Sequence, residues 1–175
     1  MRNRFGTRLA QVLEFTVDSV AQGIARAFED GRWWLLCLSE QVSASKPVGL
    51  RFGELELAVF RDSAGRARAV EDRCPHRRAP LSLGRITGDG QIQCGYHGWQ
   101  FDGAGQCRGI PALPDFTPPA GHRACTHEAR EAYGLVWVRL APGEQALPVF
   151  AAEADKRLRK VNCGPYLVNS SAPRV

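Results

Sequence analysis

The sequence predicts an all-β fold, an antiparallel barrel or sandwich with a small second sheet, preceded by one amphipathic helix. Three observations predict this. Helical periodicity gives way at Arg32 to short apolar runs of strand length, these runs are separated by turn residues, and glycine and proline cluster mainly between residues 74 and 121. The 175 residues are enough for a buried core and suggest one domain, or one domain with an arm.

The first predicted element is a helix over 7–29, because apolar residues recur there at three- and four-residue steps and Gly31 follows as a stop. Its polar face carries both signs of charge, which favours a packing arm over a membrane-surface helix. The predicted strands follow in order and are separated by turns such as 63–65 and 102–105. They cover residues 33–38, 50–60, 67–70, 91–93, 99–101, 124–130 and 135–140.

Two short motifs between these strands carry the candidate chemistry. Cys74-Pro-His76 and Cys94-Gly-Tyr-His97 each offer one thiolate and one imidazole, and 17 residues separate them. This is the ligand set of a [2Fe–2S] cluster with two cysteines on one iron and two histidines on the other. Proline after the first cysteine stiffens its loop. The glycines at 84, 95 and 98 permit the tight backbone needed where two loops converge.

The surrounding sequence is CPHRRAPLSLG at 74–84, CGYHGWQFDGAGQC at 94–107 and IPALP at 110–114. It resembles the Rieske domain of bacterial Rieske non-heme iron oxygenases, the ring-hydroxylating and demethylating family. The resemblance covers about 31–175 and implies a Rieske iron–sulfur fold with one cluster per chain. It also implies a helical arm over 1–30, the Rieske domain over 31–150, and a segment over 151–175 leading toward a catalytic domain absent from this sequence.

The resemblance implies one-electron transfer. A ferredoxin or flavin reductase is the expected donor, and the mononuclear iron of an oxygenase catalytic domain, in a neighbouring subunit of a homotrimer, is the expected acceptor. The chain has four histidines, and two belong to the motifs. His122 and His127 are expected on opposite faces of a strand, so no two-histidine, one-carboxylate iron site is predicted. Whether the chain counts as an enzyme is therefore left open.

Two other interpretations remain. The first is a stand-alone Rieske-type ferredoxin, an electron carrier; such ferredoxins are commonly shorter and lack both the N-terminal helix and the IPALP segment. The second is a Cys2His2 zinc site. Zinc fingers usually order their ligands Cys, Cys, His, His, whereas here cysteine and histidine alternate, which favours the cluster.

Charge predicts the redox properties of such a site. Two ferric ions, two sulfides, two thiolates and neutral imidazoles sum to zero, so reduction gives only −1, and histidine ligation raises the potential above that of four-cysteine clusters. Ala79 and Tyr96 stand where respiratory Rieske proteins carry a disulfide. Trp99 and Phe101 stand where those proteins place hydroxyl donors. We therefore expect a potential at the low end of the Rieske range, roughly −150 mV.

The remaining features bound the partners. A net charge of +5 favours an acidic protein partner, and the sequence has neither a nucleic-acid motif nor an apolar run that spans a membrane. Arginines at 73, 77, 78 and 85 flank the motifs, either as a docking surface or only for solubility. The other cysteines, Cys37, Cys107, Cys125 and Cys163, lack paired spacing and are expected as buried free thiols in a reducing cytoplasm.

Overall fold

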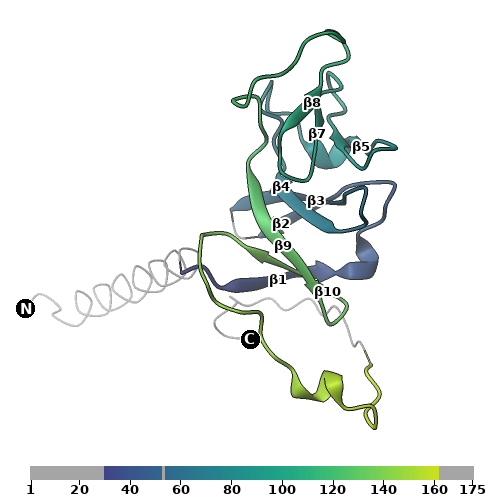
Figure 1. Ribbon diagram of the computed structural model, residues 1–175, viewed down its shortest axis with the longest axis vertical. Helices are drawn as coiled ribbons and strands as arrows, with labels where there is room; N and C mark the ends of the chain where they lie inside the picture. The colour runs from purple at the N-terminus through teal and green to yellow at the C-terminus, as the bar shows by residue number, and fades with distance from the viewer. Residues whose placement is uncertain (1–29, 53, 162–175) are drawn as a thin grey trace, which may run out of the picture.

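The computed structural model describes residues 30–52 and 54–161, so the helix predicted over 7–29 lies outside the described residues. The described strands form two antiparallel sheets (Figure 1). The strands of the larger sheet are β1 (Trp33–Leu38), β2 (Val48–Phe52), β3 (Leu55–Arg61), β4 (Ala67–Glu71), β9 (Thr126–Ala132) and β10 (Leu135–Arg139). Those of the smaller sheet are β5 (Arg85–Ile86), β6 (Ile92–Gln93), β7 (Gln100–Phe101) and β8 (Cys107–Gly109). Short 3-10 helices are η1 (Ser39–Gln41), η2 (Leu81–Leu83) and η3 (Ala151–Ala154).

The larger sheet has the strand order β1-β10-β9-β4-β3-β2, and the smaller has the order β5-β6-β7-β8. In Figure 1 the smaller sheet lies at one end of the molecule, above the larger sheet, and the segment containing η3 lies at the other end. Strand β9 connects two parts of the larger sheet. Its first residues, Thr126 and His127, pair with β4, whereas residues 128–132 pair with β10.

Strand β3 shows why the core has two parts. Its side chains alternate between the faces of the sheet, as they must in a strand. Leu57 and Val59 pack with Val136 and Val138 inside the larger sheet. Ala58 and Phe60 lie on the other face, in the cluster that reaches the smaller sheet. That second cluster also contains Val70, Cys74, Leu81, Ile92, Cys94, Phe101, Cys107, Ile110 and Ala124.

The all-β prediction is confirmed, and one predicted strand is wrong. Residues 50–60 do not form a single strand, because Phe52 pairs with Leu55 and the chain reverses between β2 and β3. The apolar alternation changes phase at this turn, from Leu50 and Phe52 before it to Leu55 and Leu57 after it. This phase change is the sequence signal of the reversal, and the prediction of one strand overlooked it. The predicted turn at 63–65 is confirmed by the hydrogen bond from Gly65 N to Asp62 O, 2.8 Å, with Gly65 at φ 74°.

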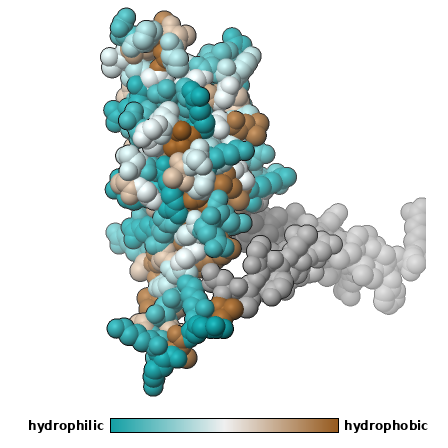
Figure 2. All heavy atoms as spheres, turned by 90° about the vertical axis from the view of Figure 1, so that its right-hand side faces the viewer, coloured by the Kyte–Doolittle hydropathy of each residue, from teal (hydrophilic) through white to brown (hydrophobic). Residues whose placement is uncertain are grey.

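The surface of the described part is mixed in character. On the face shown in Figure 2, hydrophobic side chains form small separate areas between hydrophilic ones. Exposed large apolar residues near the predicted ligands include Leu83 and Tyr96, which are 76% and 63% exposed. Among residues 30–52 and 54–161, no helix has the length and apolar character needed to cross a membrane.

Candidate metal centre

The two predicted ligand motifs form loops with the same hydrogen-bond pattern. In the first loop, which follows β4, Cys74 N donates to Ala79 O at 2.9 Å, and Arg78 N donates to Cys74 O at 2.8 Å. The second loop joins β6 to β7. There Cys94 N donates to Trp99 O at 2.8 Å, and Gly98 N donates to Cys94 O at 3.1 Å. Each loop is therefore a closed six-residue turn that begins at a cysteine.

The fifth residue of each loop lies in the left-handed region, with Arg78 at φ 58° and Gly98 at φ 74°. Glycine adopts this conformation without steric cost, whereas a residue with a Cβ pays for it. At Gly98 a Cβ would also lie 2.9 Å from Pro111 Cγ. The glycine predicted to permit a left-handed turn at 98 is therefore confirmed, and Arg78 makes the equivalent turn in the first loop without glycine.

The two thiols lie inside the protein and close together. Cys74 is 1% exposed and Cys94 is 4% exposed, both within the core cluster that joins the sheets. Burial raises the pKa of Cys74 to about 11, and its hydrogen bond with the Cys94 side chain acts in the same direction. The backbone N–H groups of His76 and Arg77 donate hydrogen bonds to the Cys74 sulfur and oppose this rise in pKa. Such N–H donors would stabilise a thiolate bound to iron.

The two imidazoles lie at the surface, beside each other. His76 and His97 are exposed, with ring centroids 4.7 Å apart. Partial desolvation lowers the pKa of His76 first, and the positive charges of His97 and Arg77 lower it further. The neutral imidazole that a metal requires is thereby favoured.

Trp99 holds one of these rings. Its indole stacks on His76 with centroids 4.8 Å apart and an interplanar angle of 4°. It also contacts the ring of His122 edge-on at 5.3 Å. From the sequence, Trp99 was predicted only as an apolar replacement for a hydroxyl donor. Its place directly after the His97-Gly98 pair is the signal that could have suggested packing against a ligand.

Backbone contacts bring the two loops together. A Cβ on Gly84 would lie 1.9 Å from Gln93 O, so only glycine allows η2 to approach β6 this closely. Gly84 has φ −86°, so its role is close approach and not a left-handed turn. The Asp72 carboxylate accepts hydrogen bonds from Ser82 N, at 2.7 Å, and from the Ser82 hydroxyl, which ties the start of the first loop to η2.

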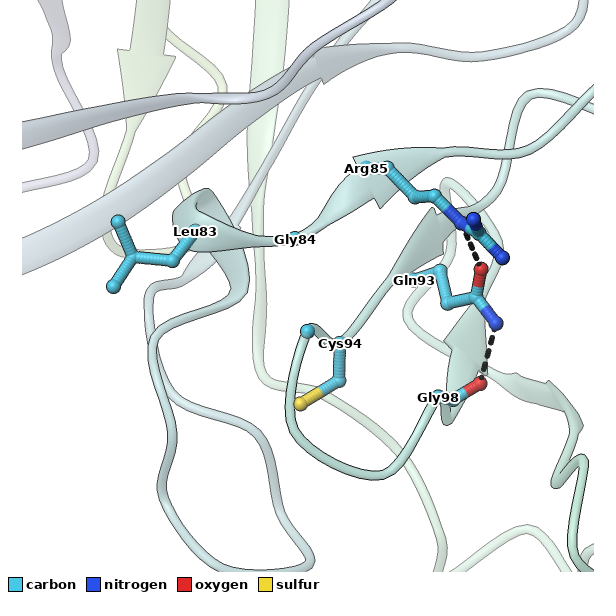
Figure 3. A pocket seen from close by; sticks show the side chains of 7 residues that line it. Leu83, Gly84, Arg85, Gln93, Cys94 and Gly98 are labelled. Carbon is cyan, nitrogen blue, oxygen red and sulfur yellow. Dashed lines mark hydrogen bonds between the residues drawn. The ribbon is translucent and has the colours of Figure 1, made fainter.

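An open pocket of about 410 Å³ lies beside the second loop (Figure 3). On one wall Arg85 Nε donates to Gln93 Oε1 at 2.5 Å, and Gln93 Nε2 donates to Gly98 O at 3.1 Å. Figure 3 shows the Cys94 sulfur pointing away from this pair of hydrogen bonds. These two hydrogen bonds support the second loop on the side away from the Cys94 sulfur.

The structure places the other predicted residues as follows. Cys37 and Cys107 are buried free thiols, as predicted. The prediction for Cys125 is wrong, because this free thiol is exposed, and Cys163 lies outside the described residues. His127 lies in β9, whereas His122 precedes the strand, so these two histidines do not share a strand.

The arrangement fits a cluster of the predicted type. Two neighbouring buried thiols face an interior supplied with N–H donors, and two adjacent imidazoles close the site toward solvent. The model of the Rieske [2Fe-2S] domain family matches residues 32–119. The chain therefore belongs to the Rieske [2Fe–2S] domain family, and its cofactor is a Rieske-type [2Fe–2S] cluster.

Individual relatives are Rieske proteins of several kinds. The chain is 39% identical over 123 residues to protein TIC 55 of Arabidopsis thaliana. This alignment covers 67% of this chain and 23% of that protein. It is 35% identical over 150 residues to methylxanthine N1-demethylase NdmA of Pseudomonas putida. This alignment covers 81% of this chain and 42% of NdmA.

Solved structures show the same similarity. The NdmA structure from Pseudomonas putida superposes with a TM-score of 0.68 at 32% identity, over 77% of this chain and 42% of that one. The structure of apo dicamba monooxygenase superposes with a TM-score of 0.65 at 34% identity. The match covers 72% of this chain and 39% of that one. The resemblance to Rieske non-heme iron oxygenases is thus confirmed, and it supports an electron-transfer role. The chain spans 23% to 42% of the length of these relatives.

Proposed function

We propose that the chain is the N-terminal electron-transfer domain of a Rieske-type oxygenase, with Cys74, His76, Cys94 and His97 as the four cluster ligands. When bound, the cluster supplies a one-electron redox couple. In this proposal a ferredoxin or flavin reductase is the donor, and mononuclear iron in an oxygenase catalytic domain is the acceptor. The expected assembly is a homotrimer that brings this domain beside a neighbouring subunit's iron.

The contrast in burial between thiols and imidazoles is the observation that carries the proposal. Cys74 and Cys94 are almost fully buried, whereas His76 and His97 are exposed. An electron therefore has its shortest path to solvent, and to a docked partner, through the imidazole side. Trp99 fixes the orientation of His76 by stacking on it. The side of the site that meets a partner is held rigid, which reduces the reorganisation that accompanies electron transfer.

The assignment to an oxygenase, and not to a stand-alone ferredoxin, rests on the length of the match to NdmA. NdmA matches over 150 residues, well beyond the stretch 32–119 that the domain family covers. A stand-alone ferredoxin needs only the domain itself. The genomic coding sequence around this chain separates the two functions. An in-frame continuation into a segment with two histidines and a carboxylate supports the oxygenase, whereas a stop codon directly after Val175 and an adjacent reductase gene support the carrier.

The ligand assignment is tested on the anaerobically purified chain. We expect two irons and two acid-labile sulfides per chain, and after dithionite a rhombic EPR signal with the low average g value of a cluster bound by two histidines. Colourless protein that contains one zinc and no sulfide would overturn the proposal.

Potentiometry then tests the role of the histidines. Replacing His97→Cys adds one negative charge to the site, so the midpoint potential should fall by on the order of 100 mV or more from a starting value near roughly −150 mV. Arg73→Gln is the matched control, because it removes one exposed positive charge beside the first loop without touching a proposed ligand. An unchanged potential in His97→Cys, with the cluster retained, would remove His97 from the ligand set.

A further inference from the structure

A second group of metal-binding side chains lies where β4 pairs with β9. Ala69 pairs with His127 and Val70 pairs with Thr126. The ladder continues by one step, because Glu71 N donates to Cys125 O at 2.8 Å. Cys125 and His127 are two residues apart and therefore project from the same face of the strand. Glu71, directly opposite Cys125, projects from that face as well.

The three side chains place their ligand atoms close together. The Cys125 sulfur, a ring nitrogen of His127 and a carboxylate oxygen of Glu71 all lie within 4.8 Å of one another. The Cys125 thiol hydrogen-bonds to the Glu71 carboxylate. Ligand atoms bound tetrahedrally to one zinc at about 2.0–2.3 Å are separated by roughly 3.6 Å. Small side-chain rotations would bring these three atoms to that spacing.

His127 supplies an independent indication of a ligand. Its Nε2 is buried and has no hydrogen-bond partner within the described part of the chain. The His127 ring also interacts with the backbone of Leu140, the residue that follows β10 in the larger sheet. Metal-bound histidines commonly donate their second ring N–H to a backbone carbonyl, which fixes the tautomer and the ring orientation. His127 thus has a buried ring nitrogen, Nε2, that no described protein group contacts through a hydrogen bond.

We propose that Glu71, Cys125 and His127 form a second metal site, separate from the cluster ligands, for a divalent cation of the zinc type. Sulfur, imidazole and carboxylate together are a ligand set that zinc accepts, whereas magnesium and calcium prefer oxygen alone. Cys125 is exposed, so solvent can supply the fourth ligand. Glu71 ends β4, three residues before Cys74, so a bound ion would brace the strand from which the first cluster loop leaves.

The sequence carries a trace of this site. Cys125-Thr-His127 repeats the C-x-H spacing of Cys74-Pro-His76. In a loop this spacing converges on one metal because the loop curves. In a strand it does so because residues two apart share a face. The carboxylate comes from a strand more than fifty residues earlier, and only the pairing of β4 with β9 brings it to the other two.

The test uses the full chain with its cluster bound. Zinc binding is measured by equilibrium dialysis, and iron and zinc are quantified together by mass spectrometry. We expect one zinc per chain with iron unchanged at two. The variants Cys125→Ser and His127→Asn should each weaken zinc binding by about 100-fold or more, since even loss of an outer-shell partner costs about 10–100-fold. Glu71→Gln should weaken it less.

Matched controls separate the site from general effects. His122→Asn changes the other histidine outside the cluster motifs, and Glu56→Gln changes an exposed carboxylate on the neighbouring strand β3. Both should bind zinc as the unmodified chain does. Zinc X-ray absorption should detect one sulfur ligand, and that sulfur should be absent in Cys125→Ser. Equal zinc binding by the unmodified chain and Cys125→Ser, or zinc uptake only with loss of iron, would overturn the proposal.

Discussion

The two sheets of this protein are built in different ways. Strands of the larger sheet have five to seven residues, and their inner faces form a continuous apolar core around Leu57, Val59 and Val136. Strands of the smaller sheet have two or three residues, which is too few for a stable sheet by pairing alone. The smaller sheet is instead held by turns, by close backbone approaches and by the core it shares with the larger sheet.

This difference between the two sheets indicates which part of the protein depends on metal binding for its folding. The core around Leu57 and Val136 contains none of the proposed ligands, whereas the core around the two loops contains the thiols of Cys74 and Cys94. Metal binding to such a region contributes directly to its folding free energy. We therefore expect the larger sheet to fold without the cluster and the smaller sheet to depend on it. Four variants test this comparison.

Cys74→Ser should have the largest effect. Loss of one thiolate should abolish stable cluster assembly and release both loops, because ligation and local folding are coupled. Hydrogen exchange should show lost protection across β5 to β8 and retained protection in β3 and β10. Cys107→Ser, a change at a buried cysteine outside the motifs, is the control and should retain its iron. Normal iron content in Cys74→Ser would exclude Cys74 as a ligand.

Leu57→Ala should weaken the scaffold and not the site. Leu57 is 0% exposed, and removing its side chain leaves a cavity that costs about 3 kcal/mol of unfolding free energy. Denaturant unfolding of the holo protein measures this loss. The spectrum and potential of the folded fraction should be unchanged, since Leu57 faces away from the core that contains Cys74 and Cys94. A shifted potential would show that the two regions are more tightly coupled than their packing indicates.

Gly98→Ala should affect the second loop by a smaller amount. The left-handed φ of 74° and the 2.9 Å approach to Pro111 together should cost about 1–2 kcal/mol. The expected result is faster loss of the cluster on mild heating, followed by visible absorption. Gly121→Ala is the control, because a Cβ there meets no atom within 4 Å. Equal cluster loss in both variants would contradict the role of Gly98.

Glu131→Gln should have the smallest effect, on the scaffold and dependent on pH. Arg61 donates two hydrogen bonds of 2.9 Å to this carboxylate, and they lower the pKa of Glu131 below 4.5 although partial burial opposes them. The stabilisation is complete above pH 4.5 and is lost as pH falls through the lowered pKa. We expect the variant to lose about 1 kcal/mol at neutral pH.

The acid branch of the stability curve provides the check for Glu131. Unfolding free energies measured between pH 7 and pH 3 should converge for Glu131→Gln and the unmodified chain at the acid end. Curves that stay parallel down to pH 3 would show that protonation of Glu131 does not contribute. Glu128→Gln is the comparison, because Glu128 lies on the same strand with a more exposed side chain.

Local sequence determined much of the candidate site. The two Cys/His motifs, the left-handed turn at Gly98 and the turn at Gly65 are local features, so their spacing and residue types predicted both the ligand loops and the family. Most strands from β3 onward were predicted for the same reason, whereas the short strands β5 and β8 were not. The β2–β3 reversal was missed although the apolar positions change phase between Phe52 and Leu55, because two strands joined by so short a turn were interpreted as one.

The contacts between residues on different strands or loops were decided by the tertiary structure alone. Only the packed structure shows that Trp99 stacks on His76, that Glu131 pairs with Arg61, and that Glu71 faces Cys125 and His127. Each of these contacts joins residues brought together by β-sheet register or by the convergence of two loops. Ligand type and spacing are local chemistry and can be read along the chain, whereas the partners across a sheet are fixed only when the whole core has packed.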